Sequence, residues 1–385
     1  MSMFMRLAVS IGMVVLALTG VTGVVLFMWL PAESWDNAAA AVMLFNFLSA
    51  ALLFLAQRYG YHIPGKLFWG RLMLTAFVWQ LLFDVLGISF GLLGLAVQSL
   101  TGWTDGLKSG AEYLAAAAGA LGFYSVFIEP CLLDSSHFEI PVPGLAKEMD
   151  GYTIAQLSDV HLGAFVPVSR LRRLLEAAVR QRPEVLVITG DLFDSPQNAV
   201  NDEAARLLDS FAYRFPDGIY YVWGNHEYYR DTEAIAKSLS RTKIHELRNS
   251  CRLVHQGVPP LYFAGVDYPF TQGVVHVRAP QYVEQACQKV PAGAVLVMLA
   301  HHPDFFDDAA AAGAVLTLSG HTHGGQIGFL GHALIPPVFN YVRGMYQKAG
   351  HYCYVHKGSG GRFPYRLGCM PELACFTLKV CQQSG

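Results

Sequence analysis

The sequence predicts an α/β domain of packed sheets, preceded by an all-α region of about four membrane-spanning helices. The helical region is indicated by a shift in composition near Asp134, before which charged residues are rare. The α/β domain is indicated by short apolar runs that alternate with amphipathic segments from Tyr152 onwards. We therefore expect a transmembrane anchor at residues 1–133 and a separate α/β domain at residues 134–385.

Composition supports this division and excludes some classes of protein. Of the 385 residues, 53% are hydrophobic and 15% are charged. Soluble domains carry about 25% charged residues, so part of the chain should lie in lipid. The net charge of -2 is close to neutral. It gives no indication of a nucleic-acid-binding protein, which would need clustered basic residues. The seven cysteines include no C-x-x-C pair, so we expect buried or free thiols in a reducing compartment and neither a disulfide framework nor a cysteine zinc site.

The membrane-spanning helices are predicted from four stretches with at most one charged residue, at residues 7–30, 37–57, 72–97 and 113–128. The fourth stretch is short for a span. Arg6 before the first stretch also fits a signal peptide, but the apolar run is long for one and three more follow, so we expect a retained helix.

The short loops predict the orientation of these helices. The loop between the second and third stretches carries Arg58, Lys66 and Arg71, whereas the loop before it carries Glu33 and Asp36. The positive-inside rule places the basic loop in the cytoplasm. With four spans, the α/β domain is then cytoplasmic and the protein is multi-pass, in a bacterial inner membrane. If the fourth stretch does not cross, the domain lies on the other side.

Asp84, within the third stretch, has two interpretations. An ionisable residue inside a span is by default a candidate for function. Alternatively, Asp84 pairs with Gln80 or with a neighbouring helix, or lies near a membrane interface.

In the α/β domain, apolar runs predict strands at residues 152–157, 185–189, 219–223, 261–266, 295–300, 315–319, 352–356 and 374–380. Amphipathic segments predict helices at residues 168–181, 204–211 and 304–311. The run at 185–189 is uninterrupted, which is typical of a strand buried on both faces.

Short polar motifs follow these predicted strands, where ligands bind in open α/β sheets. In chain order they are D-x-H at Asp159 and His161, G-D-x-x-D at Asp191 and Asp194, G-N-H-E at Asn225 and His226, H-H-P at His301 and His302, and G-H-T-H-G-G-Q at His321 and His323. Each motif alone is also compatible with a solvated loop or a turn. All of them in this order, each at a strand end, predict side chains that converge on one crevice.

The residue types fit a pair of divalent metal ions. Carboxylate, amide and imidazole ligands suit manganese, iron or zinc, and no thiolate belongs to the set. Asp191 lies between glycine-bounded turns and is suited to bridge both ions. In an extended H-x-H segment the rings alternate sides, so we expect His321 and His323 to serve different ions.

This order of motifs resembles the calcineurin-like metallophosphoesterase superfamily over residues 152–380. The tail, with G-S-G-G-R from Gly358 and P-E-L from Pro371, resembles the YkuE and YaeI branch. The multi-span anchor resembles transmembrane proteins with a metallophosphoesterase domain. The resemblance implies a β-sandwich flanked by helices, and two divalent ions with manganese expected and iron or zinc as alternatives.

The resemblance also implies a role for each motif residue. One ion would be bound by Asp159, His161, Asp191 and His323, and the other by Asp191, Asn225, His301 and His321. The ions would clamp a phosphate and lower the pKa of a water, and His226 would be the general acid or would stabilise the phosphate. The catalytic set is then Asp191, Asn225 and His226. His301 is expected to be the ligand and His302 to support it, although the reverse stays open, and Asp194 is expected to orient its loop.

The implied reaction is the hydrolysis of a phosphodiester or pyrophosphate bond. A cytoplasmic site held at the lipid bilayer suits a lipid, and some relatives of the branch resemble UDP-2,3-diacylglucosamine hydrolases of lipid A synthesis. We therefore expect a nucleotide-linked lipid as the phosphoester substrate. A general phosphodiesterase or phosphatase is the first alternative, and a non-catalytic metal-binding sensor or scaffold is the alternative of another class. The apolar segment at residues 329–350 is either an acyl groove or a packed loop.

Overall fold

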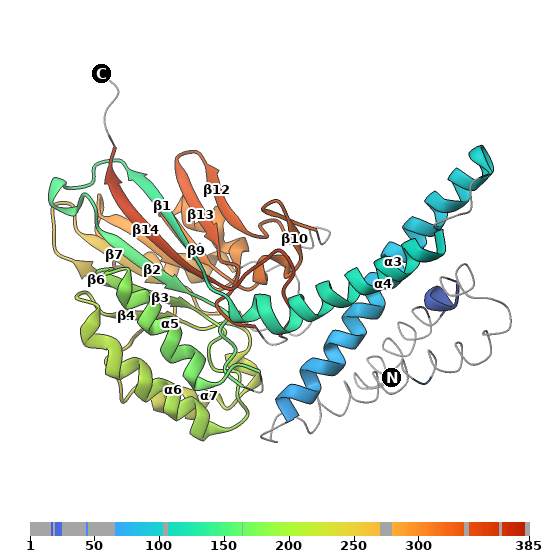
Figure 1. Ribbon diagram of the computed structural model, residues 1–385. Helices are drawn as coiled ribbons and strands as arrows, with labels where there is room; N and C mark the ends of the chain where they lie inside the picture. Colours follow the sequence, from blue (N-terminus) through green and yellow to red (C-terminus); the bar gives the residue numbers. More distant parts are fainter. Residues whose placement is uncertain are drawn as a thin grey trace. The chain divides into compact units, whose positions relative to one another are not determined.

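The structure is a computed structural model that describes residues 17, 20–24, 44, 66–102, 107–163, 165–269, 279–334, 339–361 and 364–381. The chain divides into two compact units, Met1–Ile128 and Glu129–Gly385 (Figure 1). The boundary predicted from composition, between residues 133 and 134, lies slightly further along the chain.

In the first unit, two apolar helices correspond to the third and fourth predicted spans. Helix α3 extends over Lys66–Thr101 and helix α4 over Leu107–Phe123. The chain continues from α4 through a π-helical turn, η3 (Tyr124–Ile128), into a 3-10 turn, η4 (Glu129–Cys131).

By length and composition, the segments Leu74–Thr101 and Tyr113–Cys131 could each cross a membrane. The first and second predicted spans lie outside the described residues, apart from residues 17, 20–24 and 44. An anchor of four helices therefore stays a prediction.

Asp84 is buried within the first unit and has a polar partner there. Its Oδ2 accepts a 2.7 Å hydrogen bond from the hydroxyl of Thr22, and that hydroxyl oxygen accepts a 2.8 Å hydrogen bond from Gln80 Nε2. Thr22 thus links the two α3 side chains. This contact supports the pairing interpretation of Asp84.

The second unit is built on two six-stranded sheets. The first has the order β1-β14-β2-β3-β4-β5, with β1 at Asp134–Val142, β2 at Thr153–Leu157, β3 at Val185–Thr189, β4 at Ile219–Val222, β5 at His245–Glu246 and β14 at Glu372–Val380. The second has the order β12-β13-β9-β8-β7-β6, with β6 at Ser250–His255, β7 at Leu261–Gly265, β8 at Val295–Leu299, β9 at Leu316–Ser319, β12 at Gly344–Lys348 and β13 at His351–Val355.

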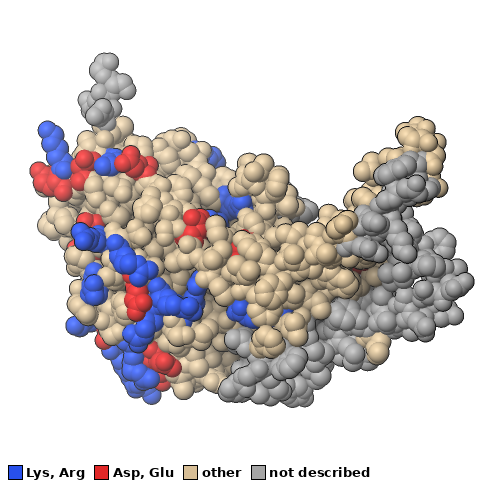
Figure 2. Space-filling view, viewed as in Figure 1, with Lys and Arg blue, Asp and Glu red and all other residues tan. Residues whose placement is uncertain are grey.

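Helices follow the parallel strands of both sheets. They are α5 (Val168–Arg180), α6 (Asn198–Phe211), α7 (Thr232–Leu239), α8 (Pro280–Cys287) and α9 (Phe306–Ala311) (Figure 1). Figure 2 shows Lys and Arg side chains gathered over the part of the surface where α5 and α6 lie, with acidic side chains between them.

Alternate side chains of the central strands enter different cores. In β3, Val185 and Val187 belong to the core between the two sheets, whereas Leu186 and Ile188 belong to the core beneath α5, α6 and α7. A further core packs α8 and α9 on the outer face of the second sheet. The domain is therefore an α/β sandwich of mixed sheets flanked by helices, and the uninterrupted apolar run of β3 reflects burial on both faces.

Candidate metal centre

The five polar motifs meet at one place in the second unit. The first residue named in each motif lies two or three positions after the end of a strand: Asp159 after β2, Asp191 after β3, Asn225 after β4, His301 after β8 and His321 after β9. Strands β2, β3 and β4 are mutually parallel, as are β8 and β9, so the loops of each set leave the same edge of their sheet. Side chains of all five motifs lie close together there, as the sequence predicted.

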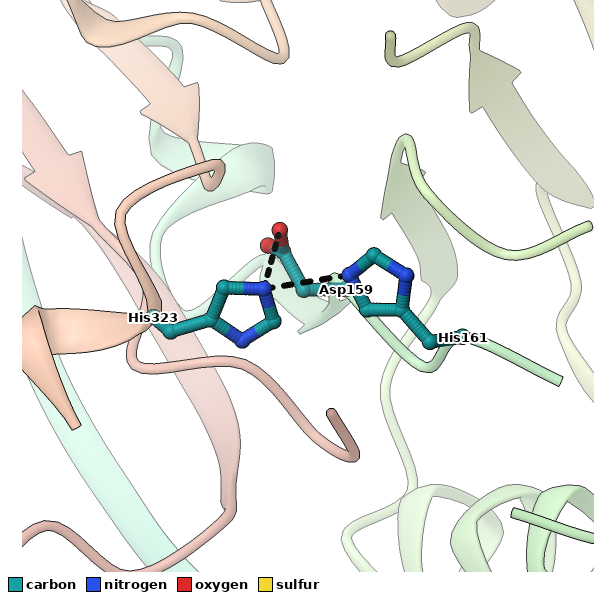
Figure 3. A group of neighbouring side chains, drawn as sticks. All are labelled: Asp159, His161 and His323. Carbon is teal, nitrogen blue, oxygen red and sulfur yellow. Dashed lines mark hydrogen bonds and ion pairs between the residues drawn. The ribbon is translucent and has the colours of Figure 1, made fainter. Parts of the chain in front are cut away.

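The first group of ligand types consists of Asp159, His161 and His323 (Figure 3). His323 Nε2 lies 3.1 Å from His161 Nε2 and 3.6 Å from Asp159 Oδ1. The three side chains come from the loops after β2 and β9, so each sheet contributes to this group. Imidazole nitrogens and a carboxylate oxygen that face one another in this way could hold a single divalent ion.

The second group consists of Asp191, Asn225, His301 and His321. His301 Nε2 lies 3.3 Å from Asp191 Oδ2 and 3.2 Å from Asn225 Oδ1. His321 Nδ1 lies 3.0 Å from the same Asn225 oxygen and 3.2 Å from His301 Nε2. The structure therefore brings together the four residues that the resemblance assigned to one ion.

Asp191 belongs to both groups through a single oxygen atom. Its Oδ2 lies 3.5 Å from His161 Nε2 in the first group and 3.3 Å from His301 Nε2 in the second. Its other oxygen, Oδ1, accepts a 2.8 Å hydrogen bond from the backbone N–H of His226, which fixes the carboxylate plane. A carboxylate held between two donor sets has the position that a bridging ligand requires.

The donor atoms fit two divalent metal ions. They are oxygen and nitrogen only, the members of each His and Asp cluster lie within 4.8 Å of one another, and all of them come from buried or half-buried side chains. A buried concentration of imidazoles and carboxylates is costly without a compensating charge, which bound cations supply.

Most of these ligands have a left-handed backbone conformation. The φ angle is positive at Asp159 (51°), His161 (52°), Asp191 (53°), His321 (71°) and His323 (51°). The expectation that H-x-H is extended was therefore wrong, since His323 begins a 3-10 turn, η9 (His323–Gly325). The two rings still enter different groups, because the turn rather than strand alternation separates them. Residues held at positive φ cluster at functional sites because the surrounding structure must stabilise them.

Glycines in the motifs leave room for the ligands. A Cβ on Gly224 would lie 2.1 Å from Asp191 Oδ1, and one on Gly190 would lie 2.5 Å from His301 Nδ1. A Cβ on Gly320 would lie 2.2 Å from Asp159 Oδ2. Such distances are too short for real contacts, so any side chain at these positions would displace a ligand.

We expect Gly320→Ala to weaken metal binding at the first group by at least about tenfold, because the new methyl group would overlap the Ser158 hydroxyl and the Asp159 carboxylate that this hydroxyl binds. Metal titration of the full-length protein, monitored by calorimetry, measures the change. Gly163→Ala is the matched control, since its Cβ would meet no atom closer than 3.6 Å. Equal metal affinity in the two variants would contradict the expected displacement.

Charge coupling sets the protonation of the metal-free centre. Burial by itself would lower the pKa of His301, but the Asp191 carboxylate raises this pKa to about 10. Burial would raise the pKa of Asp191, but His301 and His226 hold it well below its ordinary value. Burial and neighbouring positive groups lower the pKa values of His321 and His323. His301 therefore carries a proton that metal binding must displace, so metal affinity falls as the pH is lowered.

Asp194 orients two histidines and not only its loop. Its Oδ2 accepts a 3.1 Å hydrogen bond from His161 Nδ1, and its Oδ1 lies 3.0 Å from His226 Nδ1, at an angle outside hydrogen-bond geometry. Arg230 donates to both the carboxylate and the backbone carbonyl of Asp194. Burial opposes ionisation of Asp194, but the two histidines lower its pKa below the ordinary value. Asp194 thus directs the Nε2 atoms of both rings towards Asp191.

Glu227 connects two of the motif loops, a role that the sequence did not indicate although the residue completes G-N-H-E. Its fully buried carboxylate accepts hydrogen bonds of 2.8–3.1 Å from the backbone N–H groups of Asp191, Leu192, Phe193 and Gly224. Because these donors lie in the loops after β3 and β4, Glu227 fixes the bridging carboxylate relative to Asn225.

We expect Glu227→Gln to destabilise the second unit by about 2–4 kcal/mol, because the amide nitrogen that replaces one carboxylate oxygen would face backbone N–H donors and cannot accept from them. Urea unfolding of the detergent-solubilised protein, followed by tryptophan fluorescence, measures the loss. Glu233→Gln, on the exposed first turn of α7, is the control and should leave the midpoint unchanged. A midpoint in Glu227→Gln equal to that of the control would exclude this role.

Arg366 is a buried cation beside the first group that the sequence analysis did not single out, although it lies between the two motifs of the tail. Its Nη1 donates to the carbonyl oxygens of His323 and Lys357, and its Nη2 donates to Gly360 and lies 3.5 Å from His323 Nδ1. The guanidinium thus supports the His323 loop from behind and leaves Nε2 to face Asp159 and His161 (Figure 3).

Of the two adjacent histidines, the structure places His301 at the metal centre. His302 Nδ1 instead accepts a 3.2 Å hydrogen bond from the backbone N–H of Asp304, at the start of η8 (Pro303–Phe305). Its ring packs against His321 and Phe339, with centroid distances of 4.6 and 5.7 Å. His302 therefore packs against His321, and His301 is the member of the pair that lies among the candidate ligands.

An α/β sandwich that gathers carboxylate, amide and imidazole donors around a shared aspartate defines a metal-binding domain of the phosphoesterase class. The chain belongs to the calcineurin-like phosphoesterase family, whose model matches residues 152–325. It is 28% identical over 300 residues to the uncharacterized metallophosphoesterase YkuE of Bacillus subtilis, covering 73% of this chain and 96% of that protein.

Other relatives support the same family. An uncharacterized metallophosphoesterase of Aquifex aeolicus is 30% identical, over 67% of this chain and 96% of its own length. A protein of Danio rerio named transmembrane protein with metallophosphoesterase domain is 31% identical, over 63% of this chain and 56% of its own length.

Proposed function

We propose that this protein is a phosphoesterase that uses two divalent metal ions to hydrolyse a phosphodiester or pyrophosphate bond. The observation that carries the proposal is the Asp191 Oδ2 atom, which lies 3.5 and 3.3 Å from histidines of two separate donor groups. A shared carboxylate between two sets of oxygen and nitrogen donors suits a two-metal phosphoesterase.

The residues of the chain have distinct roles in this proposal. Asp159, His161, Asp191 and His323 would hold one ion, and Asp191, Asn225, His301 and His321 the other. The bound ions would supply positive charge for the phosphate and lower the pKa of a water. Manganese is our proposed metal, and iron or zinc suits the same ligands.

His226 is the proposed proton donor to the leaving oxygen. Its Nδ1 faces Asp194, and its Nε2 lies 4.0 Å from Asp191 Oδ2, on the side of the metal centre. The ring is about one-eighth exposed, with 12% of its side-chain surface accessible, so it can meet a substrate from solvent. Orientation by a carboxylate on one nitrogen leaves the other free to hold and transfer a proton.

We further propose that the site acts at a membrane, in a multi-pass protein of a bacterial inner membrane with the second unit in the cytoplasm. The anchor is supported by two helices that are long and apolar enough to cross a membrane. It is also supported by the related proteins from Danio rerio and Bos taurus, which are named transmembrane proteins. A bilayer-held site suits a lipid substrate, and UDP-2,3-diacylglucosamine is the specific candidate.

A hydrolysis assay tests the proposal. Full-length, detergent-purified protein with added Mn²⁺ is compared on UDP-2,3-diacylglucosamine and on a chromogenic phosphodiester, with Asp191→Ala as the blank. Preference for the lipid would support both the reaction and the reason for the anchor. Turnover of the diester alone would keep the phosphoesterase and remove the lipid candidate. Turnover of neither above the blank would favour a non-catalytic sensor or scaffold.

A further inference from the structure

A small apolar hairpin projects from the second unit immediately after the H-T-H-G-G motif. Its strands are β10 (Gly328–Phe329) and β11 (His332–Ala333), which pair in antiparallel fashion. Phe329, Leu330 and Leu334 are 64%, 82% and 62% exposed. Three large apolar side chains on one short hairpin are costly in water, and clustered exposure of this kind marks an interaction surface.

The tip of the hairpin holds an apolar side chain in a conformation that such residues rarely adopt. Phe329 pairs with His332, so Leu330 and Gly331 form a two-residue turn, with φ angles of 47° and 86°. Turns with two positive φ angles favour Asn, Asp or Gly at the first position. Arg343 Nε donates a 2.7 Å hydrogen bond to the carbonyl oxygen of Gly331 and braces the turn. The tip is therefore an ordered structure that presents Leu330 to its surroundings.

The base of the hairpin is joined to the residues where the candidate span Tyr113–Cys131 ends. Gly328 N–H donates a 2.8 Å hydrogen bond to the Leu367 carbonyl. The next two residues, Gly368 and Cys369, donate their N–H groups to the buried Glu129 carboxylate at 3.0 and 2.6 Å. Within the second unit, the hairpin and the end of the span thus bind adjacent residues of one segment.

The same segment reaches the metal centre. Arg366 Nη1 donates a 3.0 Å hydrogen bond to the carbonyl oxygen of the ligand His323, and Leu367 N–H donates a 3.1 Å hydrogen bond to Gln326. Residues 366–369 therefore connect the end of the span, the apolar hairpin and the loop that carries His323. A membrane surface at the end of the span would lie close to all three.

Positive charge lies near the same point. Arg170 on α5 donates hydrogen bonds of 2.9 and 2.8 Å to the carbonyl oxygens of Cys131 and Leu132, directly after the span. Arg172 and Arg173, on the same helix, are exposed. Basic side chains beside a span are attracted to anionic lipid headgroups on the cytoplasmic face.

We propose that the hairpin at residues 328–334 inserts Phe329, Leu330 and Leu334 into the headgroup region of the lipid bilayer, and so holds the metal centre against the membrane surface. The occupant of this apolar surface is the bilayer, because the hairpin is tied through residues 367–369 to the end of a candidate span, and Arg170 contacts the residues directly after that span. The inference rests on the membrane anchor of the proposed function. It implies that a lipid headgroup can reach the metal centre while its acyl chains stay in the bilayer.

Depth-dependent fluorescence quenching tests this insertion. Leu330→Cys is made in full-length protein whose exposed cysteines, Cys131 and Cys381, are replaced by serine, and is labelled with an environment-sensitive nitrobenzoxadiazole dye. The protein is reconstituted into nanodiscs of phosphatidylcholine and phosphatidylglycerol, with or without lipids that carry a doxyl quencher high on one acyl chain. Leu334→Cys provides a second position in case Leu330→Cys fails to fold. Tyr213→Cys, which is 78% exposed at the end of α6, is the matched control.

We expect blue-shifted emission from the hairpin position and at least about a twofold loss of emission with doxyl lipids, because interfacial apolar side chains lie about 5–10 Å into the headgroup and acyl boundary. The Tyr213→Cys label should show neither effect. Emission from the hairpin equal to that of the control would overturn the proposal, as would a blue shift without doxyl quenching, which indicates a protein contact. The quenching measurement does not depend on catalytic turnover. A protein without hydrolytic activity would therefore refute the proposed phosphoesterase activity and leave the result of the hairpin test unaffected.

Discussion

Replacing Asp191 with alanine is expected to abolish metal binding at both donor groups and to reduce phosphodiester turnover by at least about 10³-fold. The single oxygen Oδ2 lies 3.5 Å from His161 and 3.3 Å from His301, so its removal takes a ligand from each set at once. The loss also removes the acceptor of the His226 backbone N–H. Among the residues that the structure describes, no other side chain of the site belongs to both groups, so no other ligand substitution should have so large an effect.

Metal content and turnover should be measured on the same preparation. Inductively coupled plasma analysis gives the number of ions per chain, and the chromogenic diester gives the rate. Asp191→Asn separates charge from shape, because an amide can still accept the His226 N–H, and we expect an intermediate loss. Asp307→Asn, at an exposed carboxylate paired with Lys348, should change neither quantity. Full metal content in Asp191→Ala would show that Asp191 does not bridge.

His226→Ala is expected to keep its metal ions and to lose about 10²–10⁴-fold in turnover. His226 belongs to neither of the two ligand sets in the proposed function, and its Nε2 lies 4.0 Å from Asp191 Oδ2. Its Nδ1 lies 3.0 Å from Asp194 Oδ1, on the side of the ring away from Asp191, so removing the ring leaves both donor groups in place. The loss should therefore appear in kcat at constant metal content.

Two further variants, one for comparison and one as a control, test the prediction for His226→Ala. Asp194→Asn should lower turnover less than His226→Ala does, since it disturbs the orientation of the ring without removing it. His137→Ala, at an exposed histidine paired with Gln181, is the control. The dependence of turnover on the leaving group of the substrate gives an additional readout, because a good leaving group departs without being protonated by His226. If His226→Ala retained full turnover with stoichiometric metal, the residue would have no part in the mechanism.

The sequence by itself determined the central strands and the types of residue at the site. Residues 185–189 form β3 with the predicted bounds, because an uninterrupted run of β-branched and apolar residues is stable only when buried on both faces. The motifs at Asp159, Asp191, Asn225 and His301 were identifiable because each follows such a run. The local sequence pattern is sufficient to predict a strand and the motif after it where the whole run is buried and the chain turns at the end of that run.

Edge elements were missed because their patterns depend on partners far along the chain. β1 (Asp134–Val142) alternates half-buried and exposed residues and contains polar side chains, and it becomes a strand by pairing with β14 in parallel, as in Phe138 with Phe376. The pairing of β1 with β14 has no local signature in sequence. Helix α6 also begins earlier than predicted, at Asn198 and not at residue 204, and the buried Asn201 side chain in its first turn donates to the Ser195 carbonyl.

Only the tertiary structure decided how the donors are shared. Sequence spacing could not show that one oxygen of Asp191 faces both groups, that His321 and His323 are separated by a left-handed turn, or that Asp194 orients His161 and His226. It also could not join residues 366–369 to the end of a candidate span and to an apolar hairpin. The physical reason is that residue type follows from local chemistry, whereas distances between atoms more than 100 positions apart follow from how the two sheets pack.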